Sequence, residues 1–141
     1  MHARSFCHSL VATSMLLCMM GCRPQQPIVH TGRMITLTDS MFVTGGADTL
    51  QFGHMHAGEI ARQEMWLRNN SSHILVVTTH ETSCGCTMPE YEHQPFAPGN
   101  DLKLAITFDS QGLYGWQMKL IEFHFADRAQ PLKIYLEAEI E

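Results

Sequence analysis

The sequence has no run of basic residues and few positive charges of any kind. Lysine and arginine together number 9 against 14 aspartates and glutamates, which gives a formal net charge of -5 at pH 7. Because phosphate backbones need a basic surface to bind them, we expect no nucleic-acid partner. The same deficit argues against electrostatic attraction to anionic lipid headgroups.

The chain also lacks any segment with the 3.6-residue periodicity of an amphipathic helix. Its clearest pattern is a strict alternation over 132–140, where apolar side chains occupy every second position. The segment 102–108 alternates in the same way. Period two over such lengths predicts strands that place one face on a core and the other face in water.

Other segments predict further strands. The run 74–79 is almost entirely β-branched and apolar, which predicts a central strand covered on both sides. The apolar positions of 116–125 change phase, which predicts a β-bulge at Leu120 or Ile121. About seven or eight strands separated by turn residues predict an all-β protein, a β-sandwich over 34–141. The remaining expected strands are 34–43, 49–52 and 59–68.

The N-terminal segment predicts export. An uncharged apolar stretch, 10–20, is too short to cross a bilayer comfortably but is typical of a signal-peptide core. It ends in Gly21-Cys22, which resembles a bacterial lipobox. We therefore expect 1–21 to be a lipoprotein signal peptide, with Cys22 lipidated at the start of a proline- and glutamine-containing tether, 22–33.

Lipidation of Cys22 predicts a protein of the bacterial cell envelope, anchored outside the cytoplasm and most simply on the periplasmic face. Three acyl chains on one residue give stable anchoring, which a single chain does not. The membrane is then one expected partner, through the lipid anchor, and another envelope protein is the second. An ordinary secretory signal that is cut nearby is the alternative for this segment.

Several short motifs then occur in an order and spacing that resemble a bacterial family. They are Phe52-Gly53, Gly58-Glu59, Arg68-Asn69, Thr82-Ser83-Cys84-Gly85-Cys86-Thr87, Pro89-Glu90-Tyr91, Pro98-Gly99, Thr107-Phe108-Asp109-Ser110 and Gly112. From about Thr49 to Glu141 the chain resembles the domain-of-unknown-function family 1573 (DUF1573), which is similar to the immunoglobulin-like modules of the ASPM, SPD-2 and hydin group. The resemblance implies an immunoglobulin-like sandwich in an exported, often lipid-anchored protein, and it implies no established reaction.

Cys84 and Cys86 are the two cysteines that processing would leave unmodified, and their role admits three interpretations. The first is structural: a Cys-Gly-Cys turn that packs as free thiols or as a small disulfide ring. The second is a copper or zinc site, because Cys84, Cys86 and Met88 share a side in extended backbone and His80 lies close in sequence. A structural zinc site has four protein ligands, however, and the two thiolates would supply only half of them.

The third interpretation is thiol–disulfide exchange at the same pair. The sequence has no Cys-x-x-Cys motif, and no lysine or arginine lies near Cys84 in sequence to lower the pKa of its thiol. No nucleophile signature suggests an enzyme. We therefore expect a binding or structural module without a cofactor, with a metal-handling protein and a redox protein as the alternatives.

Overall fold

The C-terminal strand shows how alternation in the sequence becomes a buried face. In the computed structural model, which describes residues 30 and 32–141, β8 (Leu132–Ile140) buries every second side chain and leaves the others half-buried. β6 (Asp101–Asp109) buries its own alternate positions. Both predicted strands are confirmed. The predicted signal peptide, Cys22 and most of the tether lie outside the described residues.

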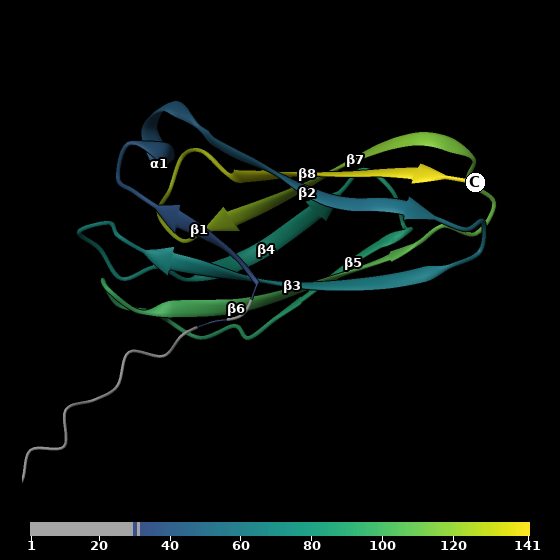
Figure 1. The fold of residues 1–141 in the computed structure, drawn as a ribbon. Coiled ribbons are helices and arrows are strands. Elements are labelled where there is room, and N and C mark those ends of the chain that lie inside the picture. The colour runs from purple at the N-terminus through teal and green to yellow at the C-terminus, as the bar shows by residue number, and fades with distance from the viewer. Residues whose placement is uncertain (1–29, 31) are drawn as a thin grey trace, which may run out of the picture.

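Eight strands form two four-stranded sheets that pack face to face, so the predicted all-β sandwich is confirmed (Figure 1). Sheet A has the order β1-β3-β6-β5 and sheet B the order β2-β8-β7-β4. With β2 set aside, this is the order ABED over CFG of a constant-type immunoglobulin domain. The other strands are β1 (Arg33–Leu37), β2 (Gly46–Met55), β3 (Ile60–Asn69), β4 (Val77–Thr82), β5 (Thr87–Tyr91) and β7 (Gly115–Phe125).

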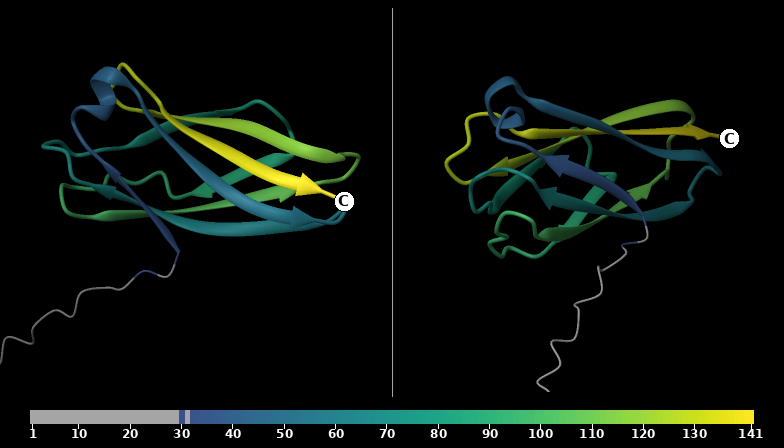
Figure 2. Two further views of the ribbon diagram at one scale, coloured as in Figure 1. Left: turned by 45° about the horizontal axis from the view of Figure 1, so that its top comes forward. Right: turned by 60° about the vertical axis from the view of Figure 1, so that its left-hand side comes forward.

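The start of the domain differs from the single strand predicted over 34–43. β1 ends at Leu37, and a one-turn helix, α1 (Met41–Thr44), leads the chain from sheet A to sheet B (Figure 2). Phe42 of α1 packs edge-on against Phe125, with ring centroids 5.2 Å apart. One turn is too short to display a helical period, so the sequence pattern does not reveal it. No helix in the described part of the chain is long and apolar enough to cross a membrane.

The run 74–79 is not the central strand that its composition predicts. β4 begins only at Val77 and lies at the edge of sheet B, with β7 as its one neighbour. Ile74 is 64% exposed, while Leu75 is buried and forms an isolated bridge with Phe96. The run 74–79 therefore spans a loop and the first three residues of an edge strand, and only some of its side chains reach the core.

The bulge predicted at Leu120 or Ile121 is also wrong. β7 pairs with β8 from Gly115 to Phe123 without a register shift. The phase change has another cause. In the first half of the strand the large apolar side chains, such as Trp116, project outward, whereas in the second half those such as Ile121 are buried. Register shifts in sheet B fall in its edge strands instead, and in β2 the shift occurs at a glycine with φ of 71°.

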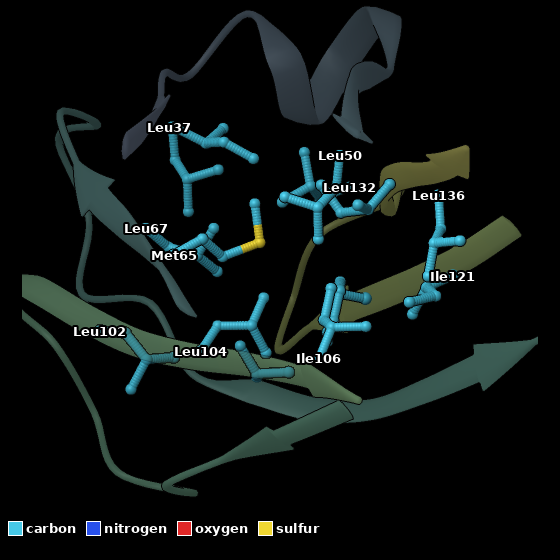
Figure 3. Close-up of a cluster of buried hydrophobic side chains, with 14 of the residues drawn as sticks. Leu37, Leu50, Met65, Leu67, Leu102, Leu104, Ile106, Ile121, Leu132 and Leu136 are labelled. Atoms are coloured by element: carbon cyan, nitrogen blue, oxygen red, sulfur yellow. The ribbon is translucent and has the colours of Figure 1, made fainter. Parts of the chain in front are cut away.

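The two sheets share one apolar core of alternating inward side chains (Figure 3). Phe108 of sheet A is fully buried, and its ring meets that of Phe52 of sheet B edge-on at 5.7 Å. A close-packed core makes the two sheets rigid supports for the residues on their outer faces. The labelled core residues are Leu37, Leu50, Met65, Leu67, Leu102, Leu104, Ile106, Ile121, Leu132 and Leu136.

His30 lies against the outer face of sheet A. Its Nε2 lies 2.7 Å from Asp101 Oδ2, and its ring stacks on Trp66 with centroids 3.6 Å apart. Asp101 also accepts two hydrogen bonds of 2.7 Å from the Arg68 guanidinium. We call His30, Trp66, Arg68 and Asp101 the latch, because together they fix the point at which the tether meets the domain.

The latch gives the fold a dependence on pH. The hydrogen bonds from Arg68, helped by the bond with His30, hold the pKa of Asp101 below its ordinary value. A lowered folded pKa stabilises the fold fully above the unfolded value of about 3.9, and this contribution is lost as the pH falls through the folded value. We expect Asp101→Asn to lower the free energy of unfolding at pH 7, with the difference from wild type shrinking below about pH 4.

Urea unfolding followed between neutral and acid pH measures this difference. Asp127→Asn is the matched control, because Asp127 is exposed in a turn and makes no ion pair within the described residues. An Asp101→Asn penalty that stayed constant down to the lowest pH would contradict the assignment to an ionised carboxylate.

Candidate functional site

The Cys-Gly-Cys turn joins β4 of sheet B to β5 of sheet A. The sulfur atoms of Cys84 and Cys86 form a disulfide, with Cα atoms 5.1 Å apart. The Thr87 hydroxyl donates to the Cys84 carbonyl at 3.0 Å, and the Cys86 N–H lies 3.0 Å from Cys84 Sγ. The motif therefore forms a closed turn that connects the edge strands of the two sheets.

The residues of the predicted metal set do not converge on one point. Met88 is 47% exposed on the outer face of sheet A, whereas Cys86 packs against the core. His80 is engaged elsewhere, since its Nδ1 lies 2.9 Å from the Tyr91 hydroxyl. Among the described residues, no group of three or more histidine, cysteine, aspartate or glutamate side chains is arranged to hold a metal ion. Thiolate ligation would first require reduction of the disulfide.

The histidines near the turn belong to an aromatic cluster that closes this side of the sandwich. Tyr91 lies at its centre, with its ring centroid 4.7 Å from that of His93, 5.6 Å from that of His80 and 5.7 Å from that of Phe123. Burial raises the pKa of Tyr91, so its phenol is neutral at physiological pH. The cluster packs the two edge strands together, which is a structural role.

The small disulfide ring is expected to contribute little to global stability. A ring closed between residues two apart restricts the unfolded chain slightly, by about 1.5 kcal/mol on the chain-entropy model. We therefore expect the double variant Cys84→Ser, Cys86→Ser to fold and to lose no more than about 2 kcal/mol of unfolding free energy. Denaturant unfolding of wild type and variant, with intact mass to confirm the bridge, measures the loss. A variant that failed to fold would show that the ring is essential to the sandwich.

A groove of about 480 Å³ lies on the outer face of sheet A, over β3, β6 and the end of β5. Several of its charged side chains are paired, such as Arg62 with Glu90 at 2.9 Å and Asp101 with Arg68 at 2.7 Å, while Glu92 also lines it. No cysteine, serine or histidine lines it.

The outer face of sheet B carries a different feature, an exposed row of large apolar side chains. Trp116 is 59% exposed, Met118 is 49% exposed, and Leu120 is half-buried at the next outward position. Tyr114, just before the strand, is 73% exposed. We call these four side chains the β7 patch. Aromatic and methionine side chains are enriched in protein interfaces, so this patch is the strongest candidate binding surface.

The patch was not predicted from the sequence, because the phase change over 116–125 was explained by a bulge at Leu120 or Ile121. The available signal was the alternation itself: Trp116, Met118 and Leu120 occupy every second position and must share a face. What the sequence alone did not supply was the identity of that face, which depends on how β7 packs between β4 and β8.

Comparisons with known proteins agree with the fold. A family model described as "Protein of unknown function (DUF1573)" matches residues 43–140. Among proteins with curated descriptions, none matches the sequence. The fold is similar to a protein of unknown function from Porphyromonas gingivalis W83, with 18% identity and a TM-score of 0.57 over 82% of this chain and 51% of that one.

The fold is also similar to part of the VesB protease of Vibrio cholerae, with 14% identity and a TM-score of 0.54 over 71% of this chain and 33% of the protease. The chain thus spans about half the length of the Porphyromonas protein and a third of the protease. At these identities the likeness extends to the fold alone.

Proposed function

Because the chain belongs to the DUF1573 family, for which no reaction is established, we propose a function from its surface: it is a lipid-anchored binding module of a bacterial cell envelope that contacts another protein through the β7 patch. The exposure of Trp116 and Met118 carries this proposal. Leaving such side chains in water forgoes the favourable burial that a partner would supply.

The disulfide supports the cellular location in the proposal. Disulfides persist in oxidising compartments such as the periplasm and are rare in the bacterial cytoplasm. The Cys84–Cys86 bridge therefore suits a protein that is exported by the signal peptide predicted for 1–21. The lipid anchor in this proposal rests on the sequence, in which Cys22 follows the predicted signal peptide.

The latch supports a definite orientation at the membrane. His30 is eight positions after Cys22 in the sequence, and eight extended residues span at most about 28 Å. His30 is fixed to the outer face of sheet A, while the β7 patch lies on the outer face of sheet B. A short tether on one face leaves the opposite face directed away from the lipid, where a protein partner can reach it.

A photo-crosslinking amino acid placed at Met118 in the living bacterium tests the proposed function. We expect an adduct of protein size at position 118. The matched control is Met88, which is exposed to a similar degree but lies on sheet A. Equal adducts at the two positions, or none at either, would overturn the proposal that the patch is the binding surface.

Replacement of Cys22 by alanine tests the anchor separately. We expect the wild-type protein to fractionate with membranes and the Cys22→Ala variant to be absent from them in mature form. A variant that was cleaved to its mature form and remained membrane-bound would refute lipidation at this residue, while leaving the cross-linking result to stand on its own.

A further inference from the structure

The outer face of sheet B has an excess of negative charge around the β7 patch. The register of β7 and β8 places Glu139 opposite Trp116 and Glu137 opposite Met118. The one lysine among the outward residues of these two strands, Lys133, pairs with Glu122 at 3.3 Å. The glutamates on this face are Glu81, Glu122, Glu137 and Glu139.

Sheet A shows that this imbalance is a local property. On its outer face Glu64 pairs with Lys103 at 2.7 Å, and the carboxylates of Glu90 and Asp101 have arginine partners. Within the described residues Glu139 has no such partner. A neutral protein that covered the β7 patch would remove water from the carboxylates without supplying a positively charged partner. Burying an unpaired charge in this way costs free energy.

A shallow hollow of about 170 Å³ lies at each end of the patch. The first is lined by Trp116 together with Glu137 and Glu139, among others. The second is lined by Leu120 together with Glu81 and Glu122, and the carboxylates of these two glutamates lie 3.6 Å from His124 and 3.3 Å from Lys133. Each hollow therefore combines an apolar wall with at least one carboxylate that has no lysine or arginine partner among the described residues, which suits the aliphatic stem and cationic head of a lysine or arginine.

We infer that the β7 patch binds a basic amphipathic helix of an envelope protein, whose apolar side chains cover Trp116 and Met118 and whose two basic side chains enter the hollows. This inference rests on the proposed function and adds the chemistry of the partner. A helix is the suitable occupant because a sheet face offers no backbone hydrogen bonds, and a helix satisfies its own.

The spacing of the hollows specifies the partner further. Trp116 and Leu120 are four residues apart on one strand, which corresponds to about 14 Å. Basic residues roughly eight positions apart on a helix are separated by about 12 Å along its axis, and flexible side chains cover the difference. Apolar residues between them on the same helix face then lie over Met118.

The charge of this face disfavours two other occupants. Anionic lipid headgroups would be repelled by the carboxylates around the patch. A second copy of the chain that docked through the same face would bring one acidic surface against another, which is destabilising across an interface. A cationic partner gains from the same charges, and its association should weaken with salt.

A synthetic amphipathic helix of about 18 residues, with leucines on one face and two arginines roughly eight positions apart, is the probe. Its control carries glutamates in place of the arginines. We expect the arginine peptide to bind the purified mature protein, held in a non-ionic detergent, at least about tenfold more tightly than the control. The NMR signal of the Trp116 indole, assigned with a Trp116→Phe variant, reports binding at the patch.

Charge variants locate the interaction. The double variant Glu81→Gln, Glu139→Gln is expected to weaken binding of the arginine peptide by at least about tenfold and to reduce its salt dependence. Glu64→Gln on sheet A is the matched control and should leave the affinity unchanged. Equal binding of the two peptides, or equal effects of the sheet A and sheet B variants, would overturn the inference.

The outcomes separate this inference from the proposed function. Cross-linking at Met118 in cells combined with no preference for the arginine peptide would leave the patch as a binding surface and overturn its cationic partner. A preference of the purified protein for anionic vesicles over neutral ones would overturn the inference as well, because it would contradict the repulsion expected from the carboxylates.

Discussion

A Phe108→Ala variant is expected to lose about 3–5 kcal/mol of unfolding free energy, a large part of the stability of a domain of this size. Phe108 is fully buried on β6, where its ring meets Phe52 of the opposite sheet. Alanine would remove the ring and leave a cavity between two sheets that are each held by their own hydrogen bonds. Because such sheets collapse only partly onto a void, most of the lost packing would not be recovered.

Guanidinium unfolding gives the change directly, with the midpoint falling and the slope unchanged if the variant keeps its fold. Tyr114→Ala provides the matched control, because Tyr114 is an aromatic residue of similar size that is largely in solvent. The Tyr114→Ala variant should lose no more than about 0.5 kcal/mol of unfolding free energy. Comparable losses in the two variants would mean that the ring of Phe108 is not the connection between the sheets that the structure depicts.

The parts of the fold that the sequence predicts are those that local alternation determines. β8 and β6 have an apolar residue at every second position and polar residues between, so their strand character and inward face follow from one period. The strand predicted over 59–68 is also found, as β3, and its second half buries Met65 and Leu67 at alternate positions. The order of the strands in the sheets follows from no such local rule, because it depends on pairing between strands that are distant in the sequence.

β4 and β7 show where local reasoning fails. The apolar character of 74–79 predicts burial, but it does not say whether a strand is central, and Ile74 is in fact exposed. In the first half of β7 the outward positions are apolar and form the exposed β7 patch. Periodicity assumes that the outward face of a strand is polar, and this patch departs from that assumption.

The latch and the acidic hollows depend on contacts between distant parts of the chain. His30 and Asp101 are 71 residues apart, and their contact requires the first residues of the domain to lie against β6. Glu81 and Glu122 become neighbours only because β4 pairs with β7 in one register. The cysteine pair is the opposite case, since its two members are adjacent enough for the sequence to propose a bridge.

The second large effect is expected at Asn69, a buried polar residue at the end of β3. Its side-chain amide donates to the carbonyls of His73 and Phe96, at 2.8 and 2.9 Å. Its carbonyl accepts hydrogen bonds from both the N–H and the hydroxyl of Ser71, at 3.0 and 2.7 Å. One side chain thus satisfies three polar groups in the turn that leads toward β4 and a fourth at Phe96, in the loop before β6.

Asn69→Ala is expected to cost about 2–4 kcal/mol of unfolding free energy, since at least one buried donor loses its partner at about 1–3 kcal/mol each. Denaturant unfolding measures the loss, and amide hydrogen exchange should show faster exchange at Ser71 than in the sheets. Asn70→Ala is the matched control, because the Asn70 side chain is exposed one position further along. If the two alanine variants were equally stable, the turn would owe its shape to its backbone contacts and not to the amide of Asn69.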